Sequence, residues 1–171
     1  MNQHNCDPRL AAAPDIAAAP DIAAVADIIR VAARRLTGAQ GATFVVREAN
    51  NCFYVDEDAI APLWKGQRFP LTACISGWAM LHNETAVVPD ITIDPRIPQA
   101  AYRPTFVRSL AMVPVGSPTP VAAIGAYWST TRQPSRAALT VLHSLATQAA
   151  EAITRVGLTN APWAPNFNPT K

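Results

Sequence analysis

The segment from Ser135 to Val156 predicts a long amphipathic helix that must bury apolar surface on two sides. Ser135 follows a proline and can cap the helix N-terminus, while Gly157 is a suitable residue for its end. Two apolar series recur at spacings of three and four residues, which is the period of a helical face. The first series is Leu142, Leu145, Ala149, Ala152 and Val156, and the second is Leu139, Ala146 and Ile153. One series can therefore cover a sheet while the other contacts a partner helix.

Short β-branched and aromatic segments predict strands upstream of this helix. Residues 42–55 read as an antiparallel hairpin, with ATFVVR and CFYV on either side of a polar turn. Residues 108–130 form a second expected hairpin, and a short strand is expected at 85–88. Pro114 lies within the second hairpin, where a proline is tolerated only at a sheet edge or a bulge.

The remaining helical segments complete the order of elements. Asp21 is a candidate N-cap for a helix that runs to about Leu36, and a short helix is expected at 75–82. The chain therefore reads as helix, hairpin, short helices around a single strand, hairpin and long helix. This order predicts an α+β sandwich, in which a mostly antiparallel sheet carries the terminal helices on one face and the irregular middle segment on the other.

The length of 171 residues suits one domain with flanking segments. A hydrophobic share of 50% against 15% charged residues is typical of a globular chain rather than a disordered one. We expect residues 1–20, which carry a drifting AAAPDI repeat, to be a flexible low-complexity segment. Residues 21–157 would form the folded domain, and residues 158–171, rich in proline and asparagine, a disordered tail.

Charge and cysteine usage argue against several classes of protein. A net charge of +2 without a dense run of Lys and Arg does not favour nucleic-acid binding. The N-terminus lacks the pattern of a signal peptide, and prolines interrupt the alanine-rich stretch, so no membrane association is expected. The three cysteines form no CxxC pair and no cluster with histidines. We therefore expect reduced thiols in a cytoplasmic protein and no metal site.

The segment 73–80 (ACISGWAM) places a thiol, a hydroxyl, a glycine and an indole close together. Ser76 can cap the short helix, and Gly77 allows the backbone to approach closely, where free N–H groups can hold an anion. An acidic and proline-rich run follows at 89–98. Together these segments are typical of the wall of a small-molecule pocket rather than of a catalytic triad.

From about Asp21 to Val156 the chain resembles a GAF domain. The resemblance rests on GATFVV (41–46), LWKG (63–66), CISGWAM (74–80), DI (90–91), DPRIP (94–98), YRPTFVRSL (102–110) and AIGAYW (123–128). These motifs look most like the GAF segments that precede the kinase core in bacterial two-component sensor histidine kinases. The resemblance implies a five- or six-stranded antiparallel sheet with a pocket on the face that the middle segment covers. It also implies dimerisation through the terminal helices, with a seam at Leu142, Leu145, Ala149, Ala152 and Val156.

The resemblance also implies where a ligand binds. Residues 74–82 and 94–106 would roof the pocket, and sheet residues would form its floor. The candidate ligand-binding residues are Phe44, Cys74, Ser76, Trp78, Asp90, Tyr102, Arg103, Arg108, Met112 and Tyr127. Arg103 and Arg108 suit bidentate contacts to a carboxylate or phosphate, although a structural pair between Arg108 and Asp90 is an equally good interpretation.

Cys74 has three chemical interpretations. It could be a redox thiol, because a helix N-terminus stabilises a thiolate. It could attach a bilin, but Ile75 follows it where cyanobacterial bilin-binding GAF domains typically have a histidine, so a bilin is not expected. It could serve an enzyme of this fold that reduces free methionine sulfoxide, although the local motif differs. We expect instead that Cys74 packs the pocket wall, with no catalytic residue nearby.

These observations favour a sensory or regulatory GAF domain that binds a small molecule and signals through its terminal helices. The cofactor is unknown, a homodimer is expected, and a histidine kinase or another signalling protein is a possible partner. No kinase core of its own is expected, and His143 reads as an ordinary helix residue. Two alternatives stay open: a reductase-like enzyme for free methionine sulfoxide, and a ligand-free module for dimerisation or docking.

Overall fold

The computed structural model of the chain describes residues 15–158. Residues 1–14 of the predicted flexible segment and residues 159–171 of the predicted disordered tail lie outside the described residues. Residues 15–20 differ from the prediction of a flexible segment. They contain a short 3₁₀ turn, η1 (Ile16–Ala18), and the side chain of Ile16 is fully buried. The Arg155 guanidinium holds this segment by donating a 2.7 Å hydrogen bond to the Ala19 carbonyl.

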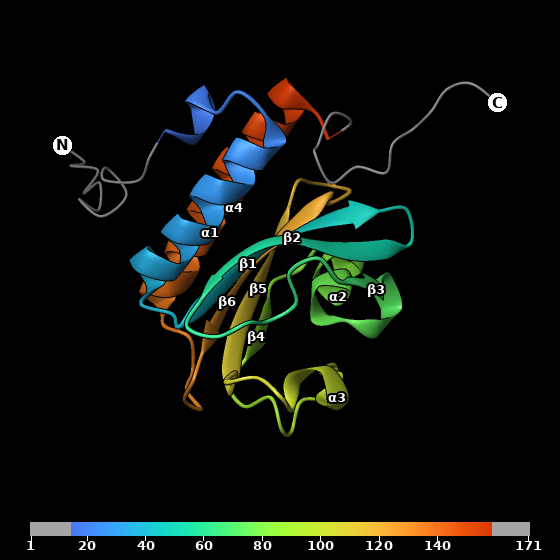
Figure 1. Cartoon of the computed structure of the whole chain (residues 1–171), viewed down its shortest axis with the longest axis vertical. Coiled ribbons are helices and arrows are strands. Elements are labelled where there is room, and N and C mark those ends of the chain that lie inside the picture. Colours follow the sequence, from blue (N-terminus) through green and yellow to red (C-terminus); the bar gives the residue numbers. More distant parts are fainter. Residues whose placement is uncertain (1–14, 159–171) are drawn as a thin grey trace.

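Helices lie on both faces of one central sheet (Figure 1). The helical elements are α1 (Ile22–Thr37), η2 (Leu71–Ala73), α2 (Ile75–His82), α3 (Gln99–Tyr102) and α4 (Arg136–Val156). Helices α1 and α4 lie side by side on one face, and α2 and α3 lie on the other. The predicted helix boundaries at Asp21 and Ser135 are confirmed. Each side chain accepts a hydrogen bond from a backbone N–H three residues on, at 2.8 and 3.1 Å.

The sheet has six strands, and every neighbouring pair in it is antiparallel. Its strands are β1 (Gly41–Glu48), β2 (Asn51–Ala59), β3 (Arg68–Pro70), β4 (Ala86–Val88), β5 (Ser109–Val115) and β6 (Ala122–Trp128), in the spatial order β3-β2-β1-β6-β5-β4. The α+β architecture is therefore as predicted. Pro114 fits in β5 because β4 pairs only with residues 110–112, so Pro114 lies beyond the end of that pairing.

Two apolar cores lie on opposite faces of this sheet. Successive side chains of a strand point to opposite faces, so Phe44 of β1 joins the core beneath α1 and α4 while its neighbour Val45 joins the core beneath α2 and α3. In β6, Trp128 and Tyr127 divide between the two cores in the same way. The sheet therefore separates a helix-side core from a pocket-side core.

The first apolar series of α4 is used inside the chain, which contradicts its prediction as a seam between two copies. Leu142 and Leu145 are fully buried in the helix-side core, and Ala149 and Ala152 are buried with them. Only Val156 of the series is partly exposed. The reason is that α1 and the sheet both pack against α4, so each apolar series has an intrachain partner.

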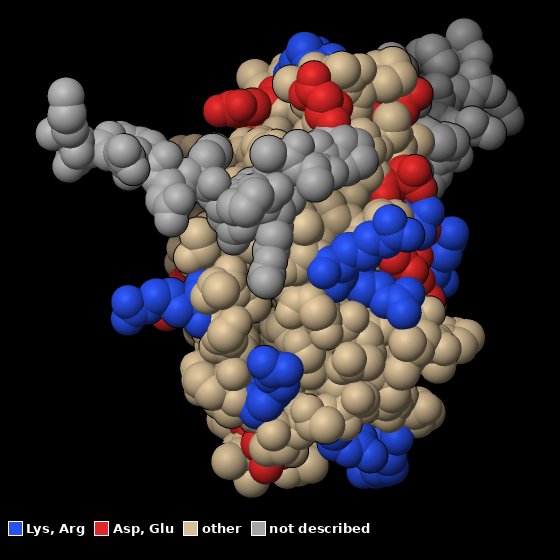
Figure 2. All heavy atoms as spheres, turned by 90° about the vertical axis from the view of Figure 1, so that its left-hand side faces the viewer, with Lys and Arg blue, Asp and Glu red and all other residues tan. Residues whose placement is uncertain are grey.

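Charged side chains tie α1 to the edge of the sheet. Arg30 pairs with Asp56 at 2.9 Å, and Arg34 pairs with Asp58 at 2.6 Å, so both pairs join α1 to β2. Figure 2 shows basic and acidic side chains beside one another at the right of the view, next to a large area without charged side chains. No helix within residues 15–158 combines the length and the apolar character needed to cross a membrane.

Candidate functional site

A small cavity lies in the pocket-side core, between β2, the start of α2 and α3. Its lining consists of Tyr54, Trp64, Phe69, Cys74, Pro98, Ala101 and Tyr102. The open volume is about 10 Å³, which is room for about one water molecule. Aromatic side chains therefore fill most of the space in which a ligand was expected.

The cavity walls are held by hydrogen bonds from the loop between β2 and β3. The Glu57 carboxylate accepts three hydrogen bonds from the backbone N–H groups of residues 63–65, at 2.9 to 3.0 Å. This positions Trp64, whose Nε1–H donates a 3.1 Å hydrogen bond to the Ala101 carbonyl. The Trp64 ring also packs against the Tyr102 ring, with 4.6 Å between centroids. The loop is therefore fastened to α3 across the cavity.

The hydroxyl groups around the cavity differ in how they are satisfied. The Tyr54 hydroxyl and the Ser76 hydroxyl lie 3.0 Å apart, and the Tyr127 hydroxyl lies 2.9 Å from that of Thr43. The Tyr102 hydroxyl is buried and has no hydrogen-bond partner within residues 15–158. Burial raises the pKa of Tyr54, Tyr102 and Tyr127 above the ordinary tyrosine value, so all three stay neutral at physiological pH.

Two cysteines belong to the pocket-side core, and one of them, Cys74, lines the cavity. Cys52 of β2 is fully buried, and Cys74 at the N-cap position of α2 is 7% exposed. The Cys74 sulfur lies 3.3 Å from the Ser76 hydroxyl and donates a 3.5 Å hydrogen bond to the Pro70 carbonyl. The neighbouring Cys52 thiol lowers the pKa of Cys74 to about 7 against the opposing effect of burial, and Cys74 together with burial raises the pKa of Cys52.

The structure brings together half of the predicted ligand-binding residues. Cys74, Ser76, Tyr102, Met112 and Tyr127 all lie on the pocket side of the sheet and contribute to the same core or its hydrogen bonds, and Cys74 and Tyr102 line the cavity. Phe44 does not. It lies on the opposite face, in the core beneath α1 and α4, so the prediction that it lines the pocket is wrong.

Trp78 lies at the outer side of α2 rather than in the cavity. It is partly exposed, stacks on the His82 ring with 4.6 Å between centroids, and is covered by the Arg96 guanidinium at 4.5 Å. Arg96 is held there by Asp94, at 2.6 Å, whose pKa this pairing lowers. The indole therefore anchors the segment after β4 to α2.

The predicted polar residues of the pocket lie at the surface. Asp90 closes a turn by accepting hydrogen bonds from the backbone N–H and the hydroxyl of Thr92, at 2.9 and 2.6 Å. Arg103 and Arg108 are exposed and do not line the cavity. Within residues 15–158, Asp90 and Arg108 form no ion pair with each other; the backbone of Ile91 bonds to the Arg108 carbonyl instead.

Three aromatic residues that line the cavity, and one cysteine of the same core, were not among the predicted ones: Tyr54, Trp64, Phe69 and Cys52. Cys52 and Tyr54 are two residues apart on β2, so they share one face of the strand. That spacing was the available signal. It did not decide which face they occupy, because the segment CFYV is apolar in both phases.

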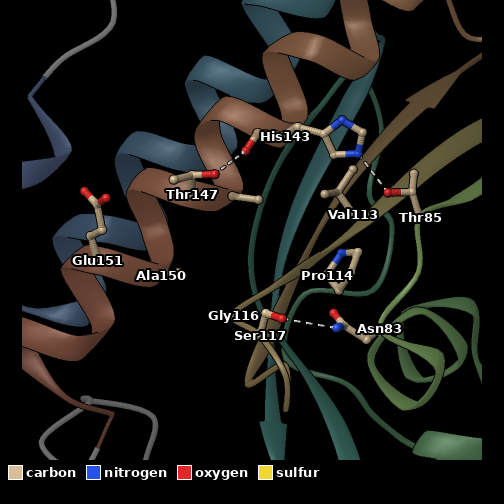
Figure 3. A pocket seen from close by; sticks show the side chains of 11 residues that line it. Asn83, Thr85, Val113, Pro114, Gly116, Ser117, His143, Thr147, Ala150 and Glu151 are labelled. Atoms are coloured by element: carbon tan, nitrogen blue, oxygen red, sulfur yellow. Dashed lines mark hydrogen bonds between the residues drawn. The ribbon is translucent and has the colours of Figure 1, made fainter.

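A second hollow is a surface groove between α4 and the turn after β5 (Figure 3). Its volume is about 420 Å³, and His143, Thr85, Asn83 and Ser117 contribute polar groups to it. The His143 ring lies 2.8 Å from the Thr85 hydroxyl, and the Asn83 amide donates to the Ser117 hydroxyl at 3.3 Å. These four polar groups pair with one another, and none of the four residues is buried.

Within residues 15–158, no three His, Cys, Asp or Glu side chains gather as a metal site would need. The polar groups that line the inner cavity include the Cys74 thiol and the Tyr54 and Tyr102 hydroxyls, beside aromatic walls.

Comparison with protein families matches residues 19–154 to the model of the GAF domain. Comparison with curated protein sequences found no match.

Three solved structures are similar in fold. The GAF domain of a phosphoenolpyruvate-protein phosphotransferase from Acinetobacter has a TM-score of 0.75 at 13% identity, over 91% of this chain and 96% of that one. A free methionine-R-sulfoxide reductase from Neisseria meningitidis, in complex with its substrate, has a TM-score of 0.69 at 19% identity, over 81% of each chain. The GAF domain of a two-component sensor histidine kinase from Bacillus halodurans has a TM-score of 0.68 at 14% identity, over 80% of this chain and 96% of that one. At these identities the likeness concerns the fold alone.

Proposed function

The chain belongs to the GAF domain family, and from this premise we propose that it is a sensory domain whose inner cavity binds a small neutral molecule. The observation that carries this proposal is the Tyr102 hydroxyl, which is buried against aromatic side chains without a partner among the described residues. A buried hydroxyl without a partner costs about 1–3 kcal/mol. A ligand that pairs with it recovers that free energy on binding.

The lining selects the charge of the ligand. Its residues are aromatic, apolar or hydroxyl- and thiol-bearing, and they include no Lys or Arg to hold an anion. We therefore propose a neutral molecule with a hydrogen-bonding group for Tyr102 rather than a carboxylate or phosphate.

A ligand larger than water must displace part of the wall, and α3 is the segment best suited to move. It has only four residues, and its carbonyl at Ala101 is fastened to Trp64 by a single side-chain hydrogen bond. The ligand would replace that contact with its own, so occupancy would be coupled to the position of α3. The sheet would carry the change to α1 and α4.

Acetamide and acetate test this proposal, because they have nearly the same shape and differ in charge. Each is titrated into the protein while the ¹H–¹⁵N NMR signals of the Trp64 indole and the Ala101 amide are followed. Acetamide is expected to shift both signals and acetate neither. Tyr102→Phe should weaken acetamide binding about five- to 150-fold, which corresponds to the 1–3 kcal/mol that pairing with the buried hydroxyl recovers. Thr140→Ala, which removes an exposed hydroxyl from α4, should have no effect.

Equal binding of the two probes, or unchanged affinity in Tyr102→Phe, would contradict a neutral-ligand site at Tyr102. If neither probe binds, a GAF module that serves dimerisation or docking without a ligand is the better description.

We propose reduction of free methionine sulfoxide as the second candidate function, because Cys74 lines the cavity and a second thiol, Cys52, lies in the same core. Two thiols can reduce a sulfoxide to a thioether, forming one disulfide and one water. Incubation with free methionine sulfoxide and dithiothreitol, followed by quantification of methionine, tests it. Turnover that disappears in Cys74→Ser supports this enzyme, and methionine formation no faster than without protein excludes it.

A further inference from the structure

A surface cleft, which we call the outer cleft, lies directly outside the inner cavity. The loop between β2 and β3 forms one side of it, and α3 with the residues that follow forms the other. Its volume is about 490 Å³, within the range of about 300–1,000 Å³ that is usual for small-molecule sites. Trp64, Phe69 and Ala101 line both the outer cleft and the inner cavity. The two hollows therefore share one wall, which these three residues form.

The shared wall is closed by few contacts. Within residues 15–158, a single hydrogen bond joins the loop to α3, from the Trp64 indole N–H to the Ala101 carbonyl at 3.1 Å. The stronger attachments of both segments lie elsewhere. The Glu57 carboxylate holds the loop through three backbone N–H groups, and the Gln99 side chain holds α3 by donating a 2.7 Å hydrogen bond to the segment after β4. The wall can therefore part while the loop and α3 stay attached to the domain.

The two hollows differ in chemistry. The inner cavity contains the Tyr102 side chain, which is 3% exposed and whose hydroxyl has no hydrogen-bond partner within residues 15–158. The outer cleft is lined mainly by prolines, alanines, a leucine and two aromatic rings, with Gln67 and Thr105 as its polar residues. Among the described residues, none that lines the outer cleft is charged. A molecule that fits both hollows is therefore neutral, with a polar group at one end and an apolar body at the other.

We propose that the inner cavity and the outer cleft are two subsites for one ligand, a neutral aromatic amide. Its amide group binds at the Tyr102 hydroxyl, and its ring occupies the outer cleft beside Trp64 and Phe69. This inference rests on the proposed function in one respect, since it uses the same Tyr102 site for the polar end of the ligand. It adds a second subsite and names the chemical class of the ligand.

An amide matches the two groups that the opened wall leaves without partners. The Tyr102 hydroxyl needs an acceptor, which the amide carbonyl supplies. The Ala101 carbonyl loses the Trp64 indole N–H when the wall parts, and an amide N–H replaces that donor. A ketone offers the acceptor alone, and a carboxylate brings a charge for which the described lining has no counterion.

Three probes separate these contributions. Acetamide carries the amide alone, acetanilide adds a phenyl ring to the amide nitrogen, and acetophenone keeps the ring and the carbonyl but has no N–H. Acetanilide should bind about tenfold tighter than acetamide, because its ring leaves water for an apolar cleft. Acetophenone should bind about two- to twelvefold more weakly than acetanilide, which is the value of one neutral hydrogen bond.

The test titrates each probe into the full chain and follows the ¹H–¹⁵N NMR signals. Gln67 and Ala100 line the outer cleft and not the inner cavity, so their backbone amide signals report on the ring. Acetanilide is expected to shift these two signals, and acetamide is expected to leave them in place. The two probes should also compete, so that a saturating concentration of acetamide raises the apparent Kd of acetanilide.

Two substitutions test the two subsites separately. Ala100 is exposed on α3, and Ala100→Trp places an indole at the outer cleft. This variant should lose the tenfold gain of acetanilide and keep the affinity for acetamide. Ala137→Trp, at an exposed position of α4, is the matched control and should change neither affinity. Tyr102→Phe should weaken acetanilide by the same factor as acetamide. Circular dichroism establishes that each variant is folded.

Several outcomes would overturn the proposal. They are an acetanilide affinity no higher than that of acetamide, simultaneous binding of the two probes, and a gain that persists in Ala100→Trp. An acetanilide affinity that is unchanged in Tyr102→Phe would place the ring in the outer cleft alone and remove the link between the subsites. Acetophenone binding as tight as that of acetanilide would remove the amide from the ligand class. In each of these cases, acetamide binding that depends on Tyr102 leaves the proposed function standing. If none of the probes binds, both proposals fail.

Discussion

Leu145→Ala should lower the stability of the folded chain rather than dissociate a dimer. Leu145 is fully buried in the core between α4, α1 and the sheet. Full burial of a leucine side chain is worth about 1.5–3 kcal/mol, and the cavity left by truncation adds to the loss, for a total of about 2–5 kcal/mol. A loss of about 3.5 kcal/mol corresponds to a fall of about 7–14 °C in the melting temperature of a domain of this size.

The measurement pairs unfolding in urea with light scattering on the folded protein. Thr147→Ala serves as the control, because Thr147 lies on the exposed face of the same helix and its replacement should change stability by no more than about 0.5 kcal/mol. An unchanged urea midpoint together with a halved molecular mass in Leu145→Ala would refute the reasoning. That result would restore the interpretation of Leu142, Leu145 and Ala149 as a seam between two copies.

Two further predictions concern the pocket side of the sheet. Tyr127→Phe and Thr43→Val each leave one buried hydroxyl without its 2.9 Å partner and should each cost about 1–3 kcal/mol in urea unfolding. The double variant should cost clearly less than the sum, and additive losses would show that this hydrogen bond contributes nothing. Gly77→Ala should destabilise the fold by more than the 1–3 kcal/mol usual for overpacking, because its Cβ would lie 1.8 Å from the Leu71 carbonyl oxygen. An unaltered melting temperature in that variant would contradict the close approach of α2 to η2.

The parts of the fold that sequence predicts well are those with local chemical signals. Asp21 and Ser135 cap their helices through their own side chains, so the signal lies within three residues of the boundary. Strand β3 had no such signal. Its three residues are mostly exposed and include a proline, and they form a strand only because β2 lies alongside them. Pairing with a distant segment cannot be read from the short segment itself.

The residues of the candidate site depend on which alternate side chains of each strand face the pocket. This is why about half of the predicted ligand-binding residues lie on the pocket side and the others do not. Phe44 and Val45 are both apolar and both fully buried, so only the position of α1 and α4 determines which of them faces the pocket. The same ambiguity hid Cys52, because Phe53 beside it is equally suited to a core. Cys74 was predicted to pack the pocket wall, and it does line the cavity.

The shared strands give the cavity a physical route to the terminal helices. Thr43 and Phe44 are neighbours on β1, yet one bonds to the pocket floor and the other packs beneath the helices. Tyr127 and Trp128 on β6 repeat this arrangement. Because the interior on each face is close-packed, a shift of either strand that accommodates a ligand must also move the side chains beneath α1 and α4. Helices α1 and α4 pack against each other and the sheet within one chain. We therefore expect occupancy of the cavity to change the packing of these two helices in the helix-side core.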